Sequence, residues 1–247
     1  MAEPDPPQRR GEPERPGWLG DLAALADGAA ASDLSRFLPP EGHRRRSAVL
    51  ILFGTADPQT DPDGGPDVLL TERAHTLRAH AGQVAFPGGV VEPGESDQEA
   101  ALREAEEETG VDPAGIEVIR VLPTIYLPVT DYSVAPVLAY WRRPAPPMVV
   151  NTDEVARVER VGIRELADPL SRFRVVHPSG FTSPGFHVRD LFVWGFTAGL
   201  LDRVMALAGW EREWDAERVV TLEAAGGRLV PRGLPASFPS PGDRLRR

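Results

Sequence analysis

The chain has 247 residues, a formal net charge of −10 at pH 7 and no cysteine. Without cysteine, a disulfide framework, a thiolate zinc site and a cysteine nucleophile are excluded, and the acidic balance argues against nucleic acid as a partner. No apolar run of about 18 residues is present, so we expect no membrane span. Because the N-terminus also lacks the apolar core of a signal peptide, we expect a cytoplasmic protein.

The first third of the chain predicts a tail, a helical region and three strands. Residues 1–17 are polar, charged and rich in proline, which is typical of a disordered tail. Residues 19–38 can form one or two helices. A short continuous apolar run predicts a buried strand at 48–54. After an Asp/Pro/Gly loop at 56–66, two further strands are expected at 67–72 and 83–86.

The next segment predicts a helix with defined ends. Ser96 followed by Glu99 is a capping-box pattern, which marks a helix start. Gly110 is of the type that follows the last helical turn. Small residues such as Ala101 and Ala105 share one arc of this helix, so one face can pack closely while acidic residues lie beside it.

Three carboxylates crowd the same helix. Glu104, Glu107 and Glu108 stand at positions i, i+3 and i+4, which places them within about 100° of arc. Such crowding of like charge destabilises a helix, and a divalent cation would relieve it. Carboxylate oxygens suit Mg²⁺ or Mn²⁺. A simple solvated acidic face is the alternative that this segment alone leaves open.

The rest of the chain predicts strands with few helices. Strands are expected at 116–127, 134–141 and 154–161, a short helix at 163–167, a hairpin of 173–176 with 187–193, and a helix at 197–208. Strand-like stretches at 219–224 and 228–230 cannot be placed from the sequence. Mixed strands with few helices favour an α/β fold, a three-layer α/β/α sandwich. We expect a disordered tail at 1–17, one domain at 18–209 and a C-terminal extension at 210–247.

The acidic helix belongs to a longer pattern: Gly89, five residues, Glu95, seven residues, then Arg103-Glu104-x-x-Glu107-Glu108-x-Gly110-Val111. This pattern resembles the Nudix box, Gx5Ex7REUxEExGU, and departs from it only in the small Ala105, where a bulkier aliphatic residue is usual. The resemblance implies a Nudix hydrolase with the mixed-sheet Nudix fold. Such enzymes split a nucleoside diphosphate linked to another group, and they use divalent metal.

The resemblance also implies residue roles. The three glutamates would be metal ligands, together with a backbone carbonyl at Gly88. Glu95 and Arg103 would brace the loop and the helix, and Gly89 would allow the tight turn. Glu107 is our candidate for the base that activates water. Some family members take that base from a later loop, and Glu154 is our second candidate.

A second motif lies directly upstream. Residues 69–89 read LLTERAHTLRAHAGQVAFPGG and resemble LLTxRSxxLRxHxGQVxFPGG, the signature of the coenzyme A pyrophosphatase branch, with Ala74 where Ser is usual. Arginine matches phosphate groups well, and coenzyme A carries a 3′-phosphate besides its diphosphate. The substrate-binding residues that we expect are Arg73, Arg78, His80, Gln83 and Gly89. The resemblance implies hydrolysis of coenzyme A to 4′-phosphopantetheine and adenosine 3′,5′-bisphosphate.

Two alternatives remain open from the sequence. Another Nudix pyrophosphatase would act on ADP-ribose or NADH, and a ligand-sensing module would keep the fold without catalysis. The intact glutamate trio argues against the sensing module, because binding alone does not need a repulsive cluster. Tyr126, Tyr132 and Phe181 are candidates for stacking against an adenine ring. The family tends to form dimers, so the oligomeric state is open between a monomer and a homodimer.

Overall fold

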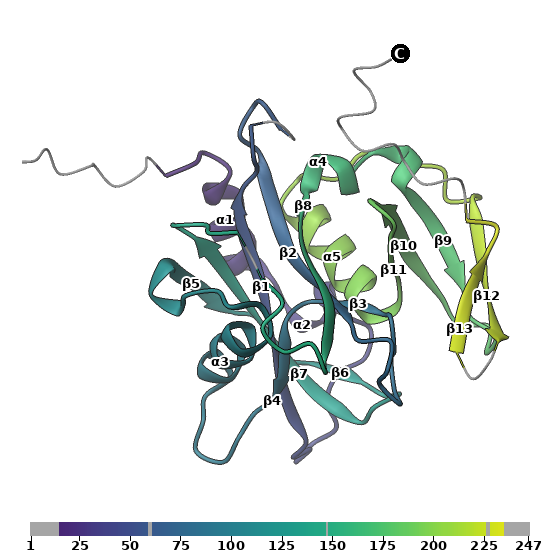
Figure 1. Ribbon diagram of the computed structural model, residues 1–247, viewed down its shortest axis with the longest axis horizontal. Helices are drawn as coiled ribbons and strands as arrows, with labels where there is room; N and C mark the ends of the chain where they lie inside the picture. Colours follow the sequence, from purple (N-terminus) through teal and green to yellow (C-terminus); the bar gives the residue numbers. More distant parts are fainter. Residues whose placement is uncertain (1–14, 59–60, 147, 226–227, 235–247) are drawn as a thin grey trace, which may run out of the picture.

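The computed structural model describes residues 15–58, 61–146, 148–225 and 228–234, arranged as in Figure 1. The helices are α1 (Leu19–Gly28), α2 (Ala31–Leu34), α3 (Asp97–Thr109), α4 (Ile163–Leu166) and α5 (Gly195–Leu207). The strands are β1 (Arg46–Thr55), β2 (Pro66–Arg73), β3 (Val84–Ala85), β4 (Gly88–Val90), β5 (Ile116–Val121), β6 (Ile125–Leu127), β7 (Tyr132–Trp141), β8 (Val155–Gly162), β9 (Arg172–Val176), β10 (Thr182–Val188), β11 (Leu191–Val193), β12 (Val219–Ala225) and β13 (Arg228–Arg232). No described helix is long and apolar enough to cross a membrane.

Strands β1 to β8 form one mixed sheet, with β1 and β7 parallel and the other pairs antiparallel. Strand β1 pairs with β2 only over 53–55 and then with β4 over 47–49, while β2 pairs with β3. Residues 84–90 therefore fill the wedge between two diverging strands. The amide of Leu50 donates to the carbonyl of Pro87 at 2.8 Å, which fixes the middle of this insert.

The first sheet lies between two helical layers. Alternate residues of a strand point to opposite faces: Leu50 and Leu52 pack with the alanines of α3, whereas Ile51 and Phe53 join the core formed with α1 and α5. Figure 1 shows α3 and α5 on opposite sides of this sheet. The predicted three-layer α/β/α sandwich with a mixed sheet is confirmed.

A second sheet, which the sequence did not predict, has the strand order β11-β10-β9-β12-β13. The expected hairpin of 173–176 with 187–193 is wrong, because β9 pairs with β10 and residues 187–193 hold the end of β10, a turn and β11. Strand β10 contains Pro184 and Gly185, which are uncommon inside strands and made this segment resemble a loop. The turn at Arg189 and Asp190 contains no glycine, although both residues have positive φ, 48° and 62°.

Two other segments differ from expectation. The single strand predicted at 116–127 is divided into β5 and β6, which pair with opposite ends of β7, and Pro123 lies in the break. The short strand β4 was not predicted, because two of its three residues are glycine.

The C-terminal strands are part of the second sheet. Strand β12 pairs in parallel with β9, and β13 pairs with β12.

Near the N-terminal end of the described residues, Trp18 contacts Tyr140 and Trp210 edge to face, at 5.6 and 6.2 Å between ring centres. The domain limits 1–17, 18–209 and 210–247 stay a prediction. Residues 1–14 and 235–247 lie outside the described part, and the β9–β12 pairing gives residues 219–232 the same sheet as 172–193.

Candidate active site

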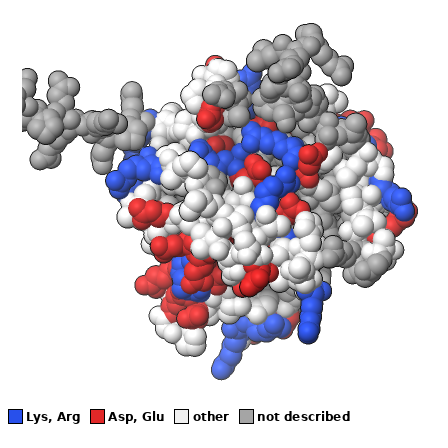
Figure 2. Space-filling model, viewed as in Figure 1, with Lys and Arg blue, Asp and Glu red and all other residues white. Residues whose placement is uncertain are grey.

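Helix α3 begins and ends where the sequence predicted. The amide of Glu99 donates to the Ser96 hydroxyl at 3.2 Å, and the amide of Ser96 donates to the Glu99 carboxylate at 2.8 Å. At the other end Gly110 adopts φ 66°, and its amide donates to the carbonyl of Glu106 at 2.9 Å. These caps fix which residues of α3 face the sheet and which face solvent. Acidic side chains gather on the surface over α3 (Figure 2).

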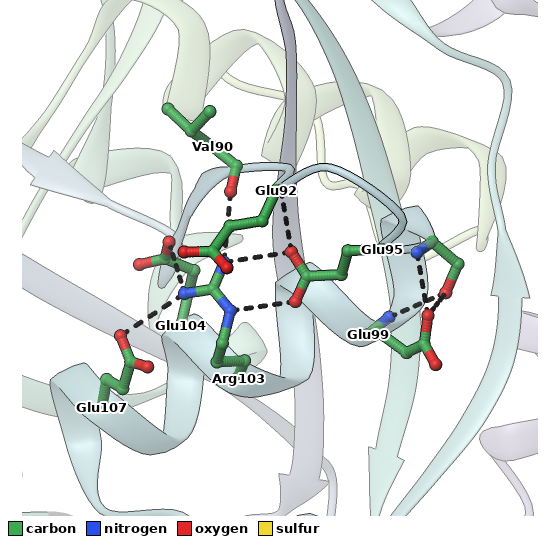
Figure 3. A network of polar contacts seen from close by, with 8 residues as sticks. Val90, Glu92, Glu95, Glu99, Arg103, Glu104 and Glu107 are labelled. Atoms are coloured by element: carbon green, nitrogen blue, oxygen red, sulfur yellow. Dashed lines mark hydrogen bonds and ion pairs between the residues drawn. The ribbon is translucent and has the colours of Figure 1, made fainter.

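Arg103 ties the helix to the loop before it (Figure 3). Its Nε and Nη2 donate to the two oxygens of Glu95 at 2.9 and 3.2 Å, and Nη2 also donates to the carbonyl of Val90 at 3.1 Å. Its Nη1 contacts Glu104 at 3.0 Å and Glu107 at 3.4 Å. The expected contact between Glu95 and Arg103 is therefore present, and the same guanidinium offsets part of the repulsion within the trio.

The two glycines before the loop leave room for the glutamates. A β-carbon on Gly89 would lie 2.3 Å from Oε1 of Glu104, and one on Gly88 would lie 2.3 Å from the carbonyl oxygen of Ala48. At Gly88 the neighbour is backbone that cannot move aside, whereas at Gly89 the Glu104 carboxylate would have to shift. The amide of Gly88 donates to Oε2 of Glu108 at 3.3 Å. The glycine pair thus brings backbone directly against two of the three carboxylates.

Glu108 is the buried member of the trio, with 4% of the residue exposed. Burial raises the pKa of its carboxyl to about 7, which the Gly88 amide and the charge of Arg73 partly oppose. The charges of Glu104 and Glu154 add to the increase. Burial likewise raises the pKa of Glu104, against the influence of its arginine partner. A positive ion among these groups would therefore favour their charged forms.

Arg73 and Glu154 approach the helix from the neighbouring strands. The β2–β8 ladder shifts register between Glu72 and Arg73, and such bulges redirect side chains. Among the described residues, Nε of Arg73 is buried without a hydrogen-bond partner. Glu154 is exposed just before β8, and its carbonyl accepts the amide of Ala74 at 2.8 Å. The Gly88 amide of the upstream motif is bonded to Glu108, and the charges of Arg73 and Glu154 also influence the pKa of that carboxyl, so the upstream motif and the acidic helix share one site.

The donor chemistry of this site suits a divalent cation. It offers four carboxylates, from Glu104, Glu107, Glu108 and Glu154, which are the hard oxygen ligands of Mg²⁺ and Mn²⁺. Within the described part of the chain, no three acidic or histidine side chains are gathered closely enough to hold an ion as they stand. Two of the glutamates bend toward Arg103 instead. Metal binding by the trio, and by the Gly88 carbonyl, therefore stays a prediction that requires these side chains to turn.

The other substrate-binding candidates lie in the loop after β2. His80 contacts Gln83 through Nδ1 and Oε1 at 2.9 Å, and His75 lies 3.4 Å from Glu72. Arg78 is exposed, as His80 is. These contacts hold the loop in shape, so Arg73 is the charged member of the motif that lies nearest to the glutamates, next to the glycine pair. Substrate binding by Arg78, His80 and Gln83 stays a prediction.

The three aromatic candidates already contact other side chains. The Tyr126 hydroxyl donates to an aspartate at 2.7 Å. The guanidinium of Arg45 lies 4.4 Å from the ring centre of Tyr132, and that of Arg36 lies 5.1 Å from the ring of Phe181. Stacking of adenine on any of these rings would need the present neighbour to move.

The burial of Glu108 was missed, although the sequence holds a signal for it. Glu108 follows Ala105 by three positions and Ala101 by seven, which places it on the same arc as the alanines that pack against the sheet. Glu107 lies outside that arc and has a side chain that is 57% exposed. The helical period therefore separates a buried carboxylate from an exposed one.

Comparison with known proteins agrees with the geometry. The NUDIX domain family model matches residues 43–180. Proteins named "Uncharacterized Nudix hydrolase NudL" are 43% identical over 188 residues in Cronobacter sakazakii and 41% identical over 189 residues in Escherichia coli K12. Each alignment covers 70% of this chain and 91% of the relative. Among solved structures, the Nudix hydrolase RenU from M. smegmatis is 20% identical with a TM-score of 0.48, covering 70% of this chain and 90% of that one.

The family model covers more than half of the chain, and the alignments with the two relatives cover most of the length of each relative. Both matches include the glutamate helix and the glycine pair before it. The chain therefore belongs to the Nudix family and is a Nudix hydrolase.

Proposed function

We propose that this Nudix hydrolase cleaves the diphosphate bond of coenzyme A or one of its derivatives with Mg²⁺ or Mn²⁺. The products would be 4′-phosphopantetheine and adenosine 3′,5′-bisphosphate. One observation carries the proposal: Arg73, from the motif that resembles the coenzyme A branch, has a buried Nε without a hydrogen-bond partner among the described residues, and its charge lowers the pKa of the buried Glu108 carboxyl. A cationic phosphate ligand beside a carboxylate cluster suits a substrate whose reacting group is a diphosphate.

Each residue of the site has a proposed role that follows from its position. Glu104, Glu107 and Glu108 would hold the cation, which when bound offsets charge on the diphosphate and acidifies water. Arg73 would bind diphosphate oxygens through its guanidinium group, whose Nε has no hydrogen-bond partner among the described residues. Glu107, the exposed member of the trio, would accept the proton of the attacking water, with Glu154 as the second candidate. The water oxygen bonds to phosphorus as the bridging P–O bond breaks, and the leaving phosphate takes the electron pair.

The loop after β2 would supply specificity. Arg78 and His80 lie farther along the same motif, in the loop after Arg73. This loop is closed by a hydrogen bond that the Arg73 amide donates to the Gln83 carbonyl at 2.9 Å. Coenzyme A differs from ADP-ribose and NADH by its 3′-phosphate. We assign recognition of that phosphate to Arg78, because Arg73 is close to the reacting end.

A substrate panel tests the proposal. Coenzyme A, dephospho-coenzyme A, an acyl-coenzyme A, ADP-ribose and NADH are incubated with Mg²⁺ or Mn²⁺, and the products are identified by mass. We expect the highest kcat/KM for coenzyme A or its acyl form. Faster turnover of ADP-ribose or NADH would overturn the substrate assignment, and no metal-dependent turnover of any compound would favour the ligand-sensing module.

A further inference from the structure

The segment between β7 and β8 runs along the C-terminal end of α3. The amide of Met148 donates to the carbonyl of Thr109 at 3.1 Å, and the amide of Val150 donates to the carbonyl of Glu108 at 3.3 Å. These carbonyls belong to the last turn of the helix, where no helical amide is available to them. A β-carbon on Gly110 would lie 3.0 Å from Cγ2 of Val150. Residues 148–150, which we call the strap, are therefore tied to the backbone of the buried glutamate.

A tight turn follows the strap. The carbonyl of Asn151 accepts the amides of Glu154 at 3.2 Å and Val155 at 2.9 Å. Its side-chain Oδ1 accepts the amide of Asp153 at 3.2 Å, which is the Asx-turn arrangement. The turn is held from the far side as well, because the Ala74 amide donates to the Glu154 carbonyl. Glu154 is thus fixed between α3 and β2 by backbone contacts on both sides.

The position of Glu154 matters to the site. It is exposed to solvent, it follows the strap whose Val150 amide is bonded to Glu108, and its own carbonyl is bonded to the residue that follows Arg73. It does not belong to either sequence motif and comes from a different element than the trio. Its distance to the trio is therefore set by the strap and the turn rather than by the helix.

We propose that Asn151 is a positioning residue, whose Asx turn delivers the Glu154 carboxylate to the glutamates of α3. The inference rests on the proposed function, since it gives that site a fourth carboxylate and names the group that places it. Asn151 would not touch substrate. Without its side-chain acceptor, the turn would lose one of its backbone bonds, and Glu154 would sample positions away from the trio.

A double-mutant cycle tests this role. Asn151→Ala is expected to lower kcat about tenfold, the usual size for an outer residue that orients an active group, while KM changes by less than about threefold. In a Glu154→Gln background the same substitution is expected to have almost no further effect, because its target is already lost. Asn151→Asp keeps the side-chain acceptor and should retain most of the activity. An equal loss in both backgrounds would overturn the proposal.

Asp215 provides a matched control. Its Oδ1 accepts the Glu217 amide at 2.9 Å and its carbonyl accepts the Arg218 amide at 3.2 Å, so it forms the same kind of turn before β12. Asp215→Ala should leave kcat unchanged. A loss of kcat equal to that of Asn151→Ala would show a general effect of turn removal and overturn the proposal.

Mn²⁺ titration of the four proteins of the cycle separates this inference from the proposed function. If no substrate is turned over, a weaker Mn²⁺ affinity in Asn151→Ala, absent in the Glu154→Gln background, would still support the positioning role. Equal weakening in both backgrounds, or no Mn²⁺ binding by the natural chain, would overturn it.

Discussion

Gly89 and Glu104 are packed so closely that a single methyl group on the glycine would overlap the carboxylate, at 2.3 Å from Oε1 and 2.4 Å from Cδ. The two residues are fifteen positions apart and come from a strand and a helix. A side chain on this glycine would therefore force the Glu104 carboxylate out of its present position.

The substitution Gly89→Ala should displace Glu104 and leave most of the fold intact. Misplacement of a reacting group by about 1 Å can lower turnover by about 100-fold, so we expect a loss of kcat near that size with Mg²⁺. Steady-state kinetics measures it. Gly20→Ala is the control, because a β-carbon there meets no atom within 4 Å, and it should be silent. Full activity in Gly89→Ala would show that the close approach has no part in catalysis.

The substitution Glu107→Gln should lower kcat by about 100-fold or more, as expected for loss of a general base or a metal ligand. Because the side chain is largely exposed, its free energy of unfolding should change by less than about 0.5 kcal/mol. Kinetics and urea unfolding on the same sample check both values. Glu106→Gln, the exposed neighbour on α3, should stay fully active. Near-normal activity in Glu107→Gln would remove Glu107 from the reaction.

The stability of the metal-free protein should fall as pH rises. Glu108 has an ordinary pKa of 4.5 in the unfolded chain and about 7 in the folded protein, so between these values the folded state binds more protons. Its contribution is therefore fully present below pH 4.5 and is lost as pH rises through about 7, with a total on the order of 3 kcal/mol.

Urea unfolding with EDTA at pH 5 and pH 8 measures this dependence. The natural chain should lose more stability between the two values than Glu108→Gln, which cannot ionise there, and added Mn²⁺ should reduce the difference. Identical pH dependence in the two proteins would show that Glu108 is not buried as described.

Arg78→Ala should change substrate preference more than turnover. If Arg78 binds the 3′-phosphate, kcat/KM for coenzyme A should fall about tenfold, or about 1.4 kcal/mol, while the value for dephospho-coenzyme A stays constant. Competition between the two substrates gives the ratio directly. Arg212→Ala, another exposed arginine, should not alter the ratio, and an equal fall for both substrates would argue against this assignment.

Local signals predicted α3 and its ends, because the capping residues Ser96 and Gly110 act within one turn of the chain. The strand β1 was equally readable from its continuous apolar run. The second sheet was not readable, because its strands are joined by pairings between distant residues such as Val220 and Val175. Non-local pairing depends on the whole fold and leaves little trace in a short window of sequence.

The site was predicted where one helix carries it and missed where several elements meet. The spacing of the trio placed three carboxylates on α3, but no spacing rule connects Arg73 on β2 with Glu108 on α3. The contact between Asn151 and Asp153 is local, yet its importance depends on Glu154 lying against another element. Which residues of different strands and helices come together depends on how the elements pack, and no local pattern in the sequence shows it.

The insert at 84–90 is held by β2 at its start, by Leu50 in its middle and by β1 at its end. An added residue there would break the pairing with β1 or with β2, or it would shift the register so that every following side chain points to the opposite face of the sheet. Extra residues between 74 and 82 would only enlarge a surface loop. Natural or designed variation in substrate choice should therefore arise through changes in the length of that loop, while the spacing from the insert to the helix stays constant.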